Sequence, residues 1–75
     1  MNEAELIKAL IRKHEEDLMA CKIQEWMYQR EYADPKNITK GQAEQNLGLY
    51  QTRIKGIEQG IEAIKLYARE KNIEL

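Results

Sequence analysis

The sequence predicts an all-α fold: an antiparallel two-helix hairpin with helices at about residues 3–32 and 40–71. Three observations lead to it. Apolar residues recur every three or four positions in both halves, the recurrence is mirrored about the middle of the chain, and the only proline, Pro35, stands close to the mirror point. A period of 3.5 residues kept in register across a turn is typical of two antiparallel helices. We therefore expect one helical-hairpin domain over residues 1–75.

The positions that follow this rhythm form a predicted seam between the helices. In the first helix they are Ala4, Ile7, Ile11, His14, Leu18, Cys21, Glu25, Tyr28 and Tyr32. In the second they are Ala43, Leu47, Tyr50, Ile54, Ile57, Ile61, Ile64, Ala68 and Lys71. When the chain folds back at Pro35, each position meets a partner such that the two residue numbers sum to 75. The pattern thus predicts the register, including a polar pair of Glu25 with Tyr50.

Capping residues mark where each predicted helix begins. Asn2 is a good N-cap for the first helix, and Glu5 stands three residues later. The residue before Pro35 is disfavoured in a helix, so residues 34–38 should form the turn. Thr39 and Gln42 have the spacing of a capping box, which places the start of the second helix near residue 40.

Composition narrows the class of protein. The chain has 12 basic and 13 acidic residues and a net charge of −1, with the two signs interspersed. Nucleic-acid-binding domains more often carry a basic stripe, so this balance argues against a nucleic-acid partner. No stretch approaches the roughly 20 apolar residues of a membrane span. The single cysteine falls on the seam, which favours a free thiol in a reducing compartment. We expect a cytoplasmic protein with no membrane attachment.

The sequence offers little for catalysis or for a metal. His14 is the only histidine, and Glu15, Glu58 and Glu62 come near it in the folded hairpin. A di-metal helical bundle uses Glu-x-x-His motifs, and none occurs here. We interpret His14 as structural and expect no enzyme activity, no catalytic residue, no metal and no cofactor.

One group of apolar residues is left over after the seam is filled. Tryptophan, methionine and arginine side chains are typical of the centres of protein interfaces. The group consists of Met19, Ile23, Trp26, Met27 and Arg30, with Leu49 of the second helix at the same level. We expect a second copy of the chain or another protein to cover it.

The second helix also carries an unusual strip of small residues. Gly56, Gly60 and Ala63 share one side, flanked by Leu49 and Tyr67. A glycine inside a helix costs about 0.5–1 kcal/mol relative to alanine. Small residues at this spacing allow close approach of another helix, by analogy with membrane helices. The alternative is that the strip lies on a solvated or bending face.

These leftover residues favour a protein that acts through its surfaces. We expect the hairpin to form a homodimer, a four-helix bundle, because a chain this short buries little core alone. The leading hypothesis is a non-enzymatic, self-associating interaction protein that binds and regulates or inhibits a larger, unidentified protein. One alternative is a nucleic-acid-binding regulator that uses Lys55, Lys65 and Arg69. Another is a helical bundle that binds a small ligand or a metal around His14.

Overall fold

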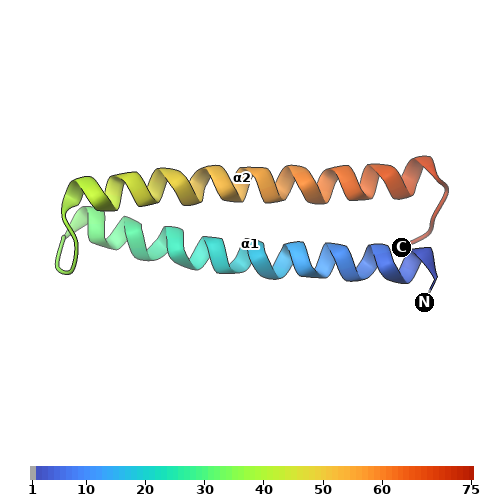
Figure 1. Cartoon of the computed structure of the whole chain (residues 1–75), viewed down its shortest axis with the longest axis horizontal. Coiled ribbons are helices and arrows are strands. Elements are labelled where there is room, and N and C mark those ends of the chain that lie inside the picture. The colour runs from blue at the N-terminus through green and yellow to red at the C-terminus, as the bar shows by residue number, and fades with distance from the viewer. Residues whose placement is uncertain (1) are drawn as a thin grey trace.

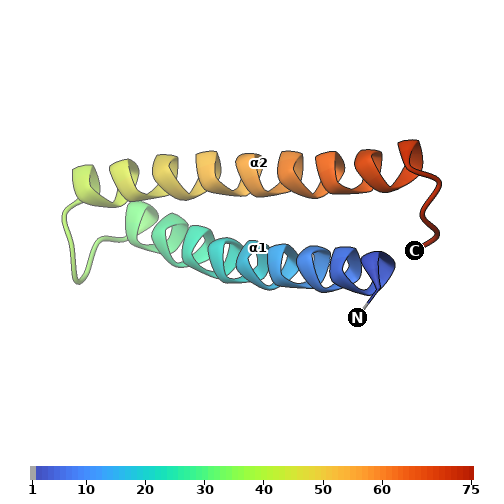
Figure 2. The same cartoon turned by 45° about the vertical axis from the view of Figure 1, so that its right-hand side comes forward.

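Two long antiparallel helices make up the fold (Figure 1). The computed structural model describes residues 2–75. Helix α1 spans Glu3–Ala33 and helix α2 spans Lys40–Glu70, with 31 residues in each. The helices lie side by side along their whole length in both views (Figures 1 and 2), within a rod of 50 × 19 × 12 Å. The predicted all-α hairpin is confirmed, and the helix ends agree with the prediction to within one residue.

The capping residues begin both helices as predicted. The side-chain oxygen of Asn2 accepts a hydrogen bond from the backbone N–H of Glu5 at 2.8 Å. At the start of α2, Thr39 Oγ1 accepts from the N–H of Gln42 at 3.1 Å, and Gln42 Oε1 accepts from the N–H of Thr39 at 3.0 Å. These bonds satisfy backbone donors that the first turn of a helix otherwise leaves free.

Helix α2 ends in a motif that the sequence analysis did not predict. Asn72 takes the left-handed conformation, with φ of 55°. The N–H of Ile73 donates to the carbonyl of Ala68 at 2.8 Å, and the N–H of Asn72 donates to that of Arg69 at 3.2 Å. This is a Schellman motif, in which asparagine replaces the usual glycine. It turns the last residues back toward the N-terminal end of α1 (Figure 1).

The core is a single stripe between the helices. Among the described residues, the four buried apolar ones are Ile7, Ala43, Ile61 and Ala68, and all four are predicted seam positions. Most of the other seam residues are half-buried, whereas Tyr32 and Lys71 are exposed. A layer of two helices has only one inner face, so each helix buries one stripe and leaves the rest of its surface in solvent.

An aromatic stack joins the two helices within the seam. The rings of Tyr28 and Tyr50 stack with their centroids 5.7 Å apart and their planes inclined by 19°. Tyr50 thus packs on Tyr28 within the seam, and the expected polar pair of Glu25 with Tyr50 stays a prediction. Such a stack adds about 0.5–1.5 kcal/mol beyond the burial of its area.

Candidate interaction surfaces

The leftover apolar group of the first helix lies on the side of α1 that faces away from α2. Ile23 is five residues from the seam positions Leu18 and Tyr28, which places it about 140° around the helix from each. Met19, Ile23, Trp26 and Met27 are 58%, 50%, 54% and 47% exposed. With Arg30 they form what we call the outer surface, and none of them contributes to the core between the helices.

Arg30 belongs to the outer surface through Trp26. Its guanidinium carbon lies 5.0 Å from the centroid of the indole ring, within the range of a cation–π contact. The contact joins a large apolar side chain to a fixed positive charge. Tryptophan and arginine are the residues most often found at the energetic centres of protein interfaces.

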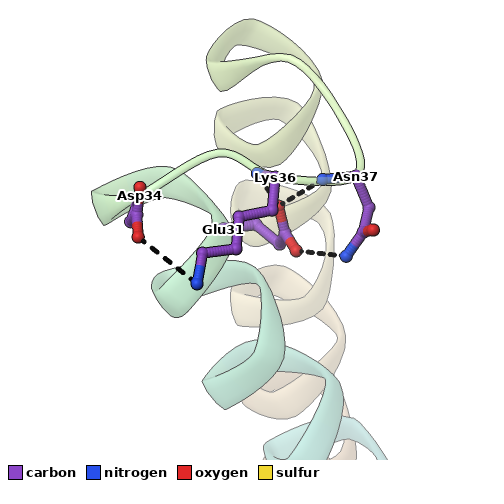
Figure 3. Close-up of polar contacts among 4 residues, drawn as sticks. All are labelled: Glu31, Asp34, Lys36 and Asn37. Carbon is purple, nitrogen blue, oxygen red and sulfur yellow. Dashed lines mark hydrogen bonds and ion pairs between the residues drawn. The ribbon is translucent and has the colours of Figure 1, made fainter.

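A shallow cavity of about 360 Å³ extends the outer surface toward the loop. It is lined by Trp26, Met27, Tyr28, Arg30, Glu31, Asn37 and Ile38. The loop side of this cavity is held by one carboxylate (Figure 3): Glu31 Oε2 accepts from the N–H groups of Lys36 and Asn37 at 3.0 and 3.3 Å, and Oε1 accepts from Asn37 Nδ2 at 2.9 Å. The Lys36 amine also lies 3.7 Å from the Asp34 carboxylate. The role of Glu31 could not be predicted from the sequence, because it depends on the path of the loop.

The hydrogen bonds to Glu31 predict a pH-dependent contribution to stability. The backbone N–H groups of Lys36 and Asn37 and the Asn37 side chain lower the pKa of Glu31 below its ordinary value of 4.5. A lowered pKa stabilises the fold above the unfolded-state pKa, and this contribution is lost as the pH falls through the folded-state value. Glu31→Gln should therefore lower the thermal midpoint at neutral pH, and the difference from the wild type should shrink below pH 4.5.

Circular dichroism melts from neutral to acidic pH measure this difference. Glu15→Gln is the matched control, because Glu15 is an exposed glutamate of the same helix that accepts no hydrogen bond among the described residues. Equal, pH-independent shifts for Glu31→Gln and Glu15→Gln would contradict the role of Glu31.

The small-residue strip of α2 lies along an edge of the hairpin and borders α1. A Cβ atom built on Gly60 would lie 3.5 Å from Cδ2 of His14, which is an ordinary contact. The Tyr67 hydroxyl donates to Glu3 Oε1 at 2.9 Å, and this bond raises the pKa of Tyr67. Gly60 thus packs within the hairpin. Gly56 is exposed, with nothing within 4 Å of a built Cβ, and Ala63 is also exposed.

Two leucines of α1 join this edge. Leu6 and Leu10 lie three and seven residues after Glu3, on the side of α1 that reaches Tyr67, and each is 50% exposed. The sequence analysis missed them because they stand beside the seam positions Ile7 and Ile11. We call the following set the edge surface: Leu6, Leu10, Gly56, Gly60, Ala63 and Tyr67. Leu49 is also exposed on α2.

His14 and Cys21, the residues considered for metal binding or catalysis, both lie on the seam between the helices. His14 is half-buried against Gly60, and its Nδ1 lies 2.8 Å from the carbonyl oxygen of Leu10. Across residues 2–75 no three histidine, cysteine, aspartate or glutamate side chains come together as a metal site would require. Cys21 is a free, half-buried thiol on the seam. Neither described helix has a stretch long and apolar enough to span a bilayer.

Comparison with known proteins finds no relative for this hairpin. No protein-family model matches the chain, and no curated protein or solved structure matches it. The outer surface and the edge surface are thus the features from which a function is inferred.

Proposed function

We propose that this chain is a non-enzymatic interaction protein, a helical hairpin that associates with a second copy and binds and regulates a larger protein. The proposal rests above all on the outer surface. Four large apolar side chains and an arginine stacked on the tryptophan lie on one face of α1 and are about half exposed.

The composition of this surface favours binding over solvation. Isolated exposed apolar residues are ordinary, whereas a cluster of one tryptophan and two methionines is typical of a binding site. Methionine side chains are flexible and polarisable, so they adapt to the shape of a partner. The exposed faces of the hairpin otherwise carry charges of both signs, which keep a long thin molecule soluble without a partner.

The shape of the molecule supports the proposal of a regulatory or inhibitory role. The molecule is a rod 50 Å long and 12 Å thick, with its apolar residues along the sides. A helix face of this kind fits an apolar groove on a larger protein, where recognition uses residues three, four and seven apart. A protein that acts in this way controls the access of other molecules to the groove that it fills.

The double variant Trp26→Ser, Met27→Ser tests the proposal. Both residues are exposed, so helicity should be retained, while self-association and partner binding weaken at least about 30-fold, as expected for interface hot spots. Light scattering and titration of the captured partner measure the two effects, and circular dichroism measures helicity.

Leu66→Ser is the matched control for the double variant. Leu66 is an apolar residue of α2, 47% exposed, that belongs to neither surface. It should leave association unchanged. If the double variant associates and binds as well as the Leu66 variant does, the outer surface is not an interface and the proposed function fails.

A further inference from the structure

We infer that the outer surface is covered by the outer surface of a second copy, with the two α1 helices antiparallel and Ile23 on the two-fold axis. The inference deepens the proposed function and rests on it, because it names the occupant and orientation of one surface. The larger protein would bind this surface in exchange for the second copy. It depends on a symmetry of residue types about Ile23.

The residues around Ile23 are self-complementary at the spacing of a helix interface. Four positions away on either side stand Met19 and Met27. Seven positions away stand Glu16 and Arg30, and eleven positions away stand Arg12 and Asp34, the last of which is the C-cap residue directly after α1. Offsets of four, seven and eleven residues share one face of a helix. The face therefore has an apolar centre flanked by charged residues. Each charge on one side of Ile23 has an opposite charge at the same distance on the other side.

An antiparallel pair of α1 helices centred on Ile23 brings residues of opposite charge together. Each residue then meets the residue equally far on the other side of Ile23 in the partner, so Glu16 meets Arg30 and Arg12 meets Asp34, twice each by symmetry. Trp26, three positions after Ile23, shares a layer with Ala20 of the second copy, three positions before it. A large side chain thus lies beside a small one.

A parallel pair through the same face is disfavoured by the same charges. It would place Glu16, Arg30 and Arg12 each against its own copy, and like charges in contact are destabilising. Arg12, Glu16, Arg30 and Asp34 are exposed, and none of them makes an ion pair across the hairpin among the described residues. Lys36 contacts Asp34 from the solvent-exposed loop, with both side chains about three-quarters exposed.

The resulting dimer differs from a bundle with one shared core. The seam and the outer surface are on opposite sides of α1, so two hairpins would join as a row of four helices with the α1 helices inside and the α2 helices outside. The interface between the two α1 helices extends from Arg12 to Asp34, a span of 22 residues. At a helical rise of about 1.5 Å per residue, its length is about 33 Å. The edge surface stays free in this arrangement.

Disulfide cross-linking of the full chain tests the orientation. In a Cys21→Ala background, which removes the native thiol, Ile23→Cys should cross-link to itself in a glutathione redox buffer. Met19→Cys and Met27→Cys should cross-link to each other when mixed, but not each to itself. A residue four positions from the axis lies about 12 Å from its own copy in an antiparallel pair, beyond the roughly 7 Å limit for bridged Cα atoms.

Charge reversal provides an independent readout. Glu16→Arg and Arg30→Glu should each weaken the dimer about tenfold, and the double variant should return to within about threefold of the wild type, because it restores the opposite charges. Self-cross-linking of Met19→Cys and of Met27→Cys, or a double variant weaker than both single variants, would overturn the antiparallel register.

The outcomes separate this inference from the proposed function. If Trp26→Ser, Met27→Ser abolishes association but the cross-links follow another pattern, the interaction surface stands and the antiparallel pairing is wrong. If the wild type associates and neither the double variant nor charge reversal affects it, both are wrong.

Discussion

Replacing Ile61 by alanine should lower the free energy of unfolding by about 2–4 kcal/mol. Ile61 is 8% exposed and is one of only four buried apolar residues within residues 2–75. Removing its side chain loses transfer free energy and leaves a cavity between two helices that have no other layer to fill it. For a domain whose whole stability is about 5–15 kcal/mol, such a change unfolds a substantial fraction of the molecules under mild denaturing conditions.

Urea denaturation followed by circular dichroism, at one fixed protein concentration, measures this loss. The control is Leu66→Ala, a truncation in the same helix at a residue that is 47% exposed, and it should change stability by less than about 0.5 kcal/mol. Losses of equal size at the two positions would contradict the seam as the source of stability.

Replacing Gly48 and Gly56 by alanine together should stabilise the hairpin by about 1–2 kcal/mol. Both lie inside α2, where each glycine costs about 0.5–1 kcal/mol relative to alanine. An added Cβ meets nothing within 4 Å at either position, so the gain in helix propensity is not offset by a clash. Thermal melts of the single and double variants measure the gain.

The same variants test the small-residue strip as a contact. If a helix of a second molecule packs closely on Gly56, alanine there would weaken association while the helicity of the dissociated chain rises. In the dimer inferred above, α2 lies outside and the edge surface is free. We therefore expect Gly56→Ala to raise stability without weakening self-association, and a weakened dimer would contradict that arrangement.

Local patterns in the sequence are sufficient to predict most of the fold. The Thr39 and Gln42 capping box depends on residues three positions apart, and the seam depends on one short period repeated along a helix. Such features lie within one element, so their geometry follows from the geometry of the helix. The Schellman motif at Asn72 was not predicted, because asparagine takes the left-handed conformation less regularly than glycine does.

Features that join distant parts of the chain were harder to predict. The helical wheel groups Gly60 with Gly56 and Ala63, but only the height and rotation of α1 beside α2 place His14 against Gly60. The three hydrogen bonds of Glu31 depend on the path of a loop that residue types alone do not determine. The stack of Tyr28 on Tyr50 results from the same relative placement of the helices.

Helix α1 carries two apolar stripes on opposite sides. One stripe faces α2 and accounts for the hairpin, and the other faces away from it and is left in solvent. A helix that is apolar on opposite sides is expected where it lies between two neighbours, and the hairpin supplies only one of them. The second neighbour is the proposed partner surface.

The fluorescence of Trp26 over a dilution series reports whether a second copy covers the outer surface. It is the only tryptophan of the chain and lies at the centre of the outer surface. If the surface is covered by a second copy, raising the protein concentration should shift the indole emission to shorter wavelength and reduce its quenching by acrylamide, while the helical signal stays constant. An indole that remains fully solvated at every concentration, in a chain that remains helical, would contradict the account.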